Sequence, residues 1–322
     1  MALPPFLKSW DGFQDANEDY THALFEHPDP IGPTHSLWWA PRDAKQSPSK
    51  IILFIPGNPG LVEFYIPFLS AIHVKDKSGR LAILAHSHIG HTPGVARGDS
   101  IEYFTLPFQV KSALEAFDAV KSTYGRETSV VLIGHSVGSW VALQILKARG
   151  LEVTGLFLLF PTISHIASTP NGRSLSWLFP QAHLIATVSR ILRILPVHLL
   201  ISIMFRSWPQ HQLLVLEKFL RSPNSIYASL AMAHDEMESI LELDVDLLQS
   251  HCHRIWLYFA EKDDWVGNEK ETILRSFIHD AGTVRVVHDE HGTPHAYCIN
   301  HGEQIASQCS EWLEDSVLPP KH

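Results

Sequence analysis

The chain has 322 residues, of which 45% are hydrophobic and 18% charged, enough apolar material for one large domain or two small ones. A formal net charge of −9, with no block rich in Lys or Arg, argues against a nucleic-acid partner. Its three cysteines cannot all pair with one another, which fits a reducing compartment better than a disulfide scaffold. The N-terminal sequence MALPPFLKSWDGF lacks the features of a signal peptide, so we expect a protein kept on the cytosolic side.

The first 45 residues, rich in Pro, Asp and His, predict either edge strands or a loose arm. Six short apolar runs follow, each ending at a turn signal: residues 51–55, 81–85, 130–133, 156–160, 255–259 and 284–287. Such runs are typical of parallel strands buried on both faces. Between them lie helix-length segments, such as residues 110–123 with an apolar stripe. This alternation predicts a mostly parallel, doubly wound α/β sheet, whose chemistry lies past the carboxyl ends of its strands.

The run at residues 130–133 leads into Gly134-His135-Ser136-Val137-Gly138 and then into a helix-compatible segment. The pattern G-x-S-x-G between a buried strand and a helix indicates a nucleophile elbow. Its glycines leave room for a sharp turn that exposes the hydroxyl of Ser136, and the helix start directs the N–H of Val137 to the same place. The alternative is a glycine-rich turn with an incidental serine.

Pro56-Gly57-Asn58-Pro59-Gly60 follows the first apolar run, where an α/β-hydrolase has its other oxyanion donor. Because Pro59 has no N–H, we expect the N–H groups of Asn58 and Val137 to form the oxyanion hole. The alternative is a loop that only reverses the chain. A phosphate-binding loop is excluded because no G-K-[ST] follows.

A serine nucleophile needs a base and an orienting acid, which in this fold follow in the order serine, acid, histidine. The loop after residues 255–259 offers Asp263 and Asp264, and the loop after residues 284–287 offers His288, His291 and His295. The residue types leave both choices open, because the imidazole must only reach the serine with one nitrogen and the carboxylate with the other. The spacing slightly favours His295, since a longer loop lets the base return over Ser136.

Histidines close together in sequence also suggest a metal site. Two groups occur: His288, His291 and His295, and His86, His88 and His91. Neither spacing matches a zinc signature, and 21 histidines make such groupings common. A metal would also leave the serine elbow unexplained, so we expect neither a metal nor a cofactor.

The alternation of strands and helices breaks between about residues 161 and 250, which predicts a helical cap inserted into a core of residues 1–160 and 251–322. Within it, residues 175–205 read LSWLFPQAHLIATVSRILRILPVHLLISIMF, with Arg190 and Arg193 as the only fixed charges. A bilayer-spanning helix needs about 20 apolar residues. Because Pro180 and Pro196 divide the stretch, we expect no transmembrane span.

Between these prolines, helical spacing places an apolar set on one face: Leu184, Ile185, Val188, Ile191, Leu192 and Leu195. An amphipathic helix with basic residues on its polar face, followed by a short apolar helix, predicts a hairpin that lies in a lipid interface. A cap that only packs its apolar faces onto the active site is the alternative, and the two roles can coexist.

Several stretches together resemble the lipid droplet-associated hydrolase family of α/β-hydrolases: IPGNPGLVEFYIPF, SHIGH, LIGHSVGSW, LLFPTI, STPNGR and TPHAY. The resemblance covers about residues 51 to 300. It implies that Ser136 is the nucleophile, that His295 in the PHA stretch is the base, and that Asp263 in a D-x-W context is the acid. Asp264 stands where relatives often have proline. The resemblance also implies a serine esterase of the lipid droplet and endoplasmic reticulum, linked to neutral-lipid turnover.

The main hypothesis is therefore a serine carboxylic-ester hydrolase acting on lipid-like acyl esters, in neutral-lipid or sterol-ester turnover. We expect it at the lipid droplet surface and the cytosolic face of the endoplasmic reticulum, with the acyl ester and a lipid monolayer as its partners. One rival is a droplet-associated scaffold with a weak or vestigial hydrolase site. The other is an acyltransferase that uses the same triad with an alcohol as acceptor.

Overall fold

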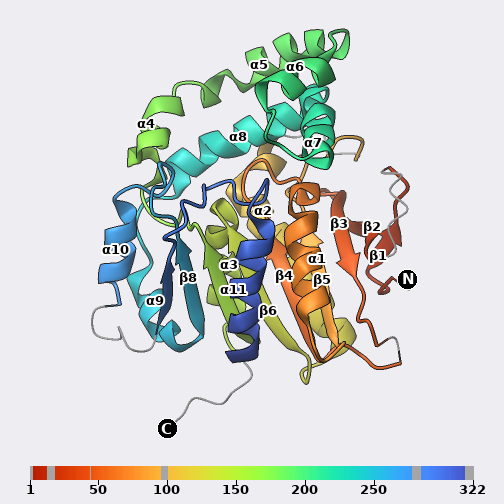
Figure 1. The fold of residues 1–322 in the computed structure, drawn as a ribbon, viewed down its shortest axis with the longest axis vertical. Helices are drawn as coiled ribbons and strands as arrows, with labels where there is room; N and C mark the ends of the chain where they lie inside the picture. The colour runs from red at the N-terminus through yellow and green to blue at the C-terminus, as the bar shows by residue number, and fades with distance from the viewer. Residues whose placement is uncertain (1–2, 13–18, 44, 96–100, 278–283, 316–322) are drawn as a thin grey trace.

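The computed structural model describes residues 3–12, 19–43, 45–95, 101–277 and 284–315. Within these ranges the chain forms one nine-stranded sheet with the strand order β1-β2-β3-β5-β4-β6-β7-β8-β9 (Figure 1). The strands are β1 Leu7–Ser9, β2 Thr21–Glu26, β3 Pro33–Trp39, β4 Lys50–Ile55, β5 Leu81–His86, β6 Ser129–His135, β7 Val153–Leu159, β8 Ile255–Phe259 and β9 Arg285–His288. The pairs from β1 to β3 and the pair β3–β5 are antiparallel, and every pair from β5 to β9 is parallel.

The parallel strands β4 to β8 are largely apolar at successive positions because both faces of the sheet are covered there, whereas β9, which was expected to be buried as well, lies at the sheet edge and is exposed or half-buried. Neighbouring residues of a strand point to opposite faces. In β4, Ile51, Leu53 and Ile55 pack into one hydrophobic core, whereas Ile52 and Phe54 pack into the core on the other side. Burying such a side chain stabilises the fold by roughly 1.5–3 kcal/mol, so the continuous apolar runs are the sequence signature of this arrangement.

Helices form a layer on each face of the sheet. One layer consists of α1 (Ile66–Lys75) and α11 (Gly302–Asp315), which pack side by side. The opposite layer consists of α2 (Leu106–Tyr124), α3 (Val137–Arg149), α9 (Val245–Ser250) and α10 (Glu269–Arg275). The predicted doubly wound, mostly parallel α/β sheet is confirmed.

Of the two alternatives for the first 45 residues, the described part forms edge strands, with β1 outermost.

The longest helix of the region between β7 and β8 is α8 (Pro223–Ser239). Its N-cap, Ser222, accepts a hydrogen bond from the N–H of Ser225, and Pro223 occupies the first turn, where its missing N–H costs nothing.

A helical insertion separates β7 from β8 and lies over the carboxyl ends of the parallel strands (Figure 1). Its helices are α4 (Pro170–Leu175), α5 (Ala182–Ser189), α6 (Val197–Met204), α7 (Gln210–Leu220) and α8, with the 3-10 turns η3 (Ile166–Ser168), η4 (Phe179–Gln181) and η5 (Arg190–Arg193). α8 is central, because it contacts α5 on one side and the sheet edge on the other. The division at residues 161 and 250 stays a prediction; α9, inside that range, packs into the core of the sheet through Leu247 and Leu248.

The two most apolar helices of the insertion face outward. In α5 the small residues Ala182 and Ala186 pack against α8, whereas Leu184 and Val188 are exposed. This is the reverse of a helix in a soluble protein, which turns its large apolar side chains inward. No single helix among the described residues is long and apolar enough to cross a membrane; Phe179–Arg193 and Val197–Met204 meet that test only together, bent by 107°.

Candidate active site

Ser136 lies on a sharp turn between β6 and α3. Its backbone is in the left-handed region, with φ 55° and ψ −125°, which is strained for a residue other than glycine. The flanking glycines are needed for close packing: a Cβ on Gly134 would lie 2.4 Å from the carbonyl oxygen of Gly138, and a Cβ on Gly138 would lie 2.2 Å from that of Ile55. The turn leaves Ser136 partly exposed while the residues on either side are buried.

Three side chains predicted from the sequence converge at this turn. Nε2 of His295 lies 2.9 Å from Oγ of Ser136, and Nδ1 of the same ring lies 2.7 Å from Oδ2 of Asp263. Ser136 follows β6, Asp263 follows β8 and His295 follows β9, so the parallel sheet brings the three loops to one edge. This geometry can carry a proton from a serine hydroxyl to an imidazole held by a carboxylate.

The two adjacent aspartates have different environments. Oδ1 of Asp263 accepts hydrogen bonds from the N–H groups of Trp265 at 2.9 Å and Val266 at 3.3 Å, which fixes Oδ2 toward His295. Asp264 is exposed, and its backbone carbonyl accepts a hydrogen bond from Asn171. Of the two candidates, the structure brings Asp263 to the histidine.

The hydrogen bond to Ser136 comes from His295, and the other histidines of the two sequence clusters have different surroundings. His288 and His291 are exposed. His88 is buried and bonds the carbonyl of Pro56 through Nε2 at 3.0 Å, while Nδ1 of His91 accepts the N–H of Gly60 at 2.9 Å. Burial lowers the pKa of His88 to about 4 and that of His91 well below its usual value, so both rings are neutral. They hold the loop after β4, and the described residues contain no group of His, Cys, Asp and Glu placed to hold a metal ion.

The loop after β4 lies against the serine turn, since a Cβ on Gly57 would lie 3.0 Å from Cβ of Ser136. The N–H of Gly57 is bonded to the hydroxyl of Tyr65 at 3.1 Å, so the next N–H along the loop is that of Asn58. Val137 is the first residue of α3, and the first N–H groups of a helix have no partner within it. Its position follows Ser136 directly, as the oxyanion donor of an elbow must.

A buried hydrogen-bond chain joins this loop to the loop that carries His295. The hydroxyl of Tyr65 accepts the N–H of Gly57 and donates to Nδ1 of His135 at 2.7 Å. Nε2 of His135 then donates to the backbone carbonyl of His295 at 2.9 Å. Burial lowers the pKa of His135 well below its usual value, which keeps the ring neutral and fits the single proton, on Nε2, that this chain requires.

Asp289 organises the turn before His295. Its carboxylate accepts hydrogen bonds from the hydroxyl of Tyr258 at 2.7 Å and from the N–H and hydroxyl of Thr293 at 2.7 and 2.9 Å. Burial acts to raise the pKa of Asp289, but these donors outweigh it and hold the pKa below its usual value. Sequence reasoning missed Tyr65 and His135, which bond one another 70 positions apart, and Asp289, whose partners include Tyr258, 31 positions away.

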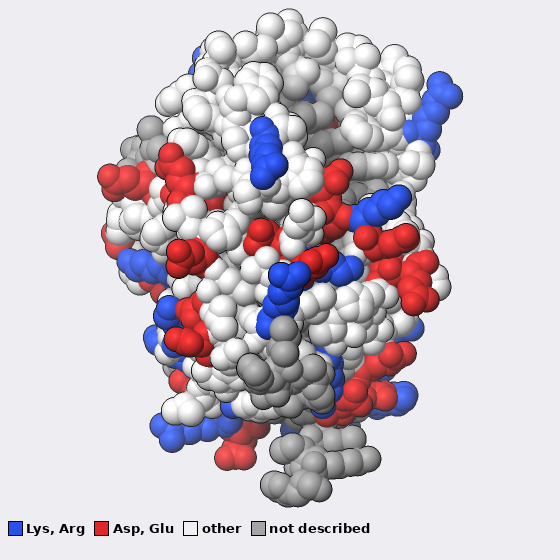
Figure 2. Space-filling model, turned by 90° about the vertical axis from the view of Figure 1, so that its left-hand side faces the viewer, with Lys and Arg blue, Asp and Glu red and all other residues white. Residues whose placement is uncertain are grey.

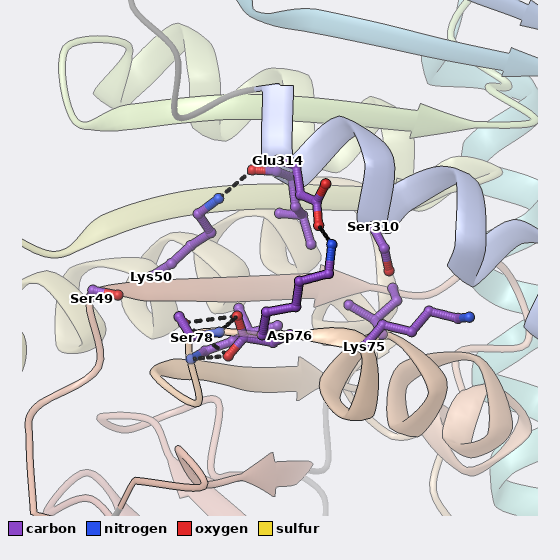
Figure 3. A pocket seen from close by; sticks show the side chains of 11 residues that line it. Ser49, Lys50, Lys75, Asp76, Ser78, Ser310 and Glu314 are labelled. Carbon is purple, nitrogen blue, oxygen red and sulfur yellow. Dashed lines mark hydrogen bonds and ion pairs between the residues drawn. The ribbon is translucent and has the colours of Figure 1, made fainter.

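A hollow of about 400 Å³ lies at the opposite end of the sheet from Ser136, beside the amino ends of β4 and β5 (Figure 3). Lys50 there donates to the carbonyl of Leu313 at 2.6 Å, and Lys77 pairs with Glu314 at 2.8 Å. Two of the charged side chains around this hollow, Lys77 and Glu314, therefore bind one another. In sheets of this kind chemistry occurs at the carboxyl ends of the strands, so the candidate site is the one around Ser136.

Sequence comparison finds lipid droplet-associated hydrolases among the relatives of this chain. A family profile described as lipid-droplet associated hydrolase matches residues 48–298. The lipid droplet-associated hydrolase of Homo sapiens is 29% identical over 293 residues, covering 84% of this chain and 86% of the human protein. The proteins of the same name from Mus musculus and Gallus gallus are 26% and 25% identical, each covering 85% of this chain and respectively 87% and 88% of their own length.

Solved structures share the architecture. A Rhodococcus hydrolase of 2-hydroxy-6-oxo-6-phenylhexa-2,4-dienoate aligns with a TM-score of 0.65 at 15% identity, covering 92% of this chain and 99% of its own. An epoxide hydrolase from Vigna radiata aligns with a TM-score of 0.64 at 14% identity and the same coverage. At such identities the likeness establishes the fold alone. The predicted α/β-hydrolase fold with a helical cap insertion is confirmed.

Proposed function

This chain belongs to the lipid-droplet associated hydrolase family, and from that membership we propose that it is a serine carboxylic-ester hydrolase acting on lipid-like acyl esters at the lipid droplet surface. It is a hydrolase of the α/β-hydrolase type. The serine chemistry, the ester substrate and the place of action are the parts that we propose. The observation that carries the proposal is the contact of Ser136 Oγ with His295 Nε2, whose ring is held by Asp263.

In the first half of the proposed reaction, Oγ of Ser136 attacks the ester carbonyl carbon while Nε2 of His295 accepts its proton. Asp263 orients the ring and stabilises the imidazolium that forms. The N–H groups of Asn58 and Val137 stabilise the negative charge that develops on the carbonyl oxygen. Collapse of the tetrahedral intermediate breaks the bond to the alcohol, which leaves with the proton of His295, and the acyl group stays on Ser136.

In the second half, water replaces the alcohol. His295 accepts a proton from the water as its oxygen attacks the acyl carbonyl. Collapse then releases the carboxylic acid and returns the proton to Oγ of Ser136. An alcohol acceptor would give acyl transfer by the same steps; we propose water, in keeping with the hydrolase family to which the chain belongs.

The outward face of the insertion supports a lipid surface as the place of action. Leu184, Val188 and Ile191 are 61%, 55% and 54% exposed, and Ile194 is 85% exposed. Four large apolar residues of α6 are exposed as well: Leu199, Leu200, Ile203 and Met204. Soluble proteins rarely leave so much large apolar surface open to water, and such patches mark interaction sites. Buried in a lipid monolayer, these side chains would lose their contact with water.

The charges around this face also fit a lipid monolayer. Arg190 and Arg193 are exposed between α5 and α6, where a cation can meet a phosphate headgroup. Figure 2 shows few charged residues at the upper end of the molecule, where Figure 1 places the cap helices, and many of both signs below it. We propose that α5 and α6 lie in the monolayer of a droplet, or in the cytosolic leaflet of the endoplasmic reticulum, without spanning it.

Labelling with a fluorophosphonate probe, in the wild type and in Ser136→Ala, tests the proposal. The probe reacts only with an activated serine, so the wild type should be labelled and Ser136→Ala should not. Equal labelling of both proteins would exclude Ser136 as the nucleophile. A folded wild type that resists the probe would instead favour a droplet-associated scaffold with a vestigial site.

A further inference from the structure

The side chain of Asn58 connects the loop after β4 to the cap. Its Nδ2 donates to the backbone carbonyl of Ser229 at 2.9 Å and to Oε1 of Glu236 at 2.8 Å. Both acceptors belong to α8, and both are far from Asn58 in the sequence. The residue that we propose as an oxyanion donor through its backbone is thus held through its side chain by the insertion.

The burial of the Glu236 carboxyl group costs stability. Glu236 is 4% exposed, and its helix neighbour Asp235 is already bonded, through Oδ2, to the N–H of Leu106 at 2.6 Å. Burial, opposed by the hydrogen bond from Asn58, raises the pKa of Glu236 to about 8, so the carboxyl is neutral near pH 7. A buried carboxyl in a helix that packs mainly through apolar residues calls for a reason beyond stability.

We propose that Glu236 is a positioning residue of the cap, which holds the Asn58 side chain so that the Asn58 N–H points at the developing oxyanion. This inference rests on the proposed function. Gly57 and Gly60 are anchored through their N–H groups to Tyr65 and His91, whereas Asn58 between them is anchored through Glu236 and Ser229. When the Glu236 carboxyl is removed, the Asn58 amide keeps only the carbonyl of Ser229 as acceptor. The peptide plane that carries the Asn58 N–H can then rotate.

The size of the effect follows from what an oxyanion donor contributes. Removal of a whole donor typically costs about a hundredfold to a thousandfold in kcat. Glu236→Ala leaves the donor in place but loosens it, so we expect kcat on a short soluble ester to fall roughly tenfold to a hundredfold, with KM changed little. Glu236→Gln keeps a carbonyl oxygen for Asn58 and should stay within about threefold of the wild type.

The kinetic experiment compares these variants with Glu238→Ala, which removes an exposed carboxylate from the same helix. It also includes Asn58→Ala and the double variant Asn58→Ala/Glu236→Ala. If Glu236 acts through Asn58, the double variant should be no slower than Asn58→Ala alone. Additive losses, an equal loss in Glu236→Gln and Glu236→Ala, or an unchanged kcat in folded Glu236→Ala would each overturn the inference.

A measurement without catalysis separates this inference from the proposed function. In protein labelled with ¹⁵N at the asparagine side chains, the Asn58 resonances are identified by their loss in Asn58→Ala. One Nδ2 proton resonance should move upfield in Glu236→Ala and keep its position in Glu236→Gln. Resonances that are identical in all Glu236 variants would overturn the inference even if the enzyme proved inactive. The predicted shift in a protein that resists the fluorophosphonate probe would instead locate the failure in the proposed chemistry.

Discussion

The carboxyl edge of the sheet and the outer surface of the cap place side chains in opposite environments. At the sheet edge, the polar groups of Tyr65, His135 and Asp289 are buried, and each bonds a named partner. On α5 and α6, large apolar side chains face outward, while small residues such as Ala186 pack inward. In the function we propose, the first arrangement fixes the geometry of the reacting groups, and the second offers apolar area to a lipid surface. The two regions should therefore respond differently to substitution.

The largest effect should come from the acid at the sheet edge. Asp263→Asn should lower kcat by about 10⁴-fold, because the amide disturbs the orientation and proton position of His295. Asp264→Asn, a matched change at an exposed neighbour, should stay within about threefold. Steady-state rates on a short soluble ester measure both. A larger loss of activity for Asp264→Asn would show that the acid is Asp264 and not Asp263.

The next effect concerns the cap and should leave the chemistry in place. Replacing Leu184, Val188, Ile191 and Leu195 with serine should weaken binding to phosphatidylcholine-coated triolein droplets by at least about a hundredfold, since four exposed apolar side chains are removed. Flotation of droplets with bound protein measures this.

The matched control replaces Val74 and Leu151, which are exposed on the body of the enzyme, with serine, and it should bind droplets as the wild type does. If the control weakens binding as much as the cap variant does, the lipid contact is not specific to the cap. If the cap variant binds normally but unfolds at a lower temperature, the stretch is a structural part of the cap.

A smaller effect is expected from the buried chain behind the triad. Tyr65→Phe leaves the N–H of Gly57 and Nδ1 of His135 without their shared partner. We expect a loss of stability of about 1–3 kcal/mol and a fall in kcat of roughly tenfold with KM retained. Tyr124→Phe, at the far end of α2, is the control for loss of a tyrosine hydroxyl. Equal kinetics in the two variants would limit Tyr65 to a packing role.

The smallest predicted effect is a pH dependence of stability. Burial raises the pKa of Glu63 to about 7 and that of Glu236 to about 8, against 4.5 when unfolded. The folded state therefore holds these protons while the unfolded state releases them. The contribution of these two protonated carboxyl groups to the stability of the fold is fully present below pH 4.5. It declines as the pH rises and is lost above about pH 8. The free energy of unfolding of Glu236→Gln, taken relative to that of the wild type, should therefore be higher at pH 8.5 than at pH 5 by about 1 kcal/mol or more.

Urea unfolding at the two pH values measures this difference. Comparing the variant with the wild type at each pH cancels the contributions of buried histidines such as His86, whose pKa is lowered by burial and whose effect has the opposite sign. A gain that is equal at both pH values would show that Glu236 does not change its protonation between them.

The sequence predicted features whose signals are local. The Ser136 elbow combines a strand, a turn and a helix within a short segment, and the apolar face of α5 follows from its helical period. The sequence signal that distinguishes His295 from His288 and His291 is less direct, because it depends on how a loop folds back. Tyr65 and His135 lie 70 positions apart, and Asn58 and Glu236 lie 178 apart, so no local pattern connects them. Their roles appear only once β4, β6 and α8 are packed together.

Hydrolysis of the same ester linkage in a dissolved and in an emulsified substrate tests the central claim most directly. The substrates are a dissolved short-chain ester and an emulsified long-chain lipid with the same ester linkage. Each is given to the wild type, to Ser136→Ala and to the cap variant with serine at positions 184, 188, 191 and 195. The wild type should hydrolyse both, Ser136→Ala neither, and the cap variant only the dissolved ester. Hydrolysis by Ser136→Ala at the wild-type rate, or loss of both activities in a folded cap variant, would contradict a serine esterase whose chemistry lies in the core and whose lipid contact lies in the cap.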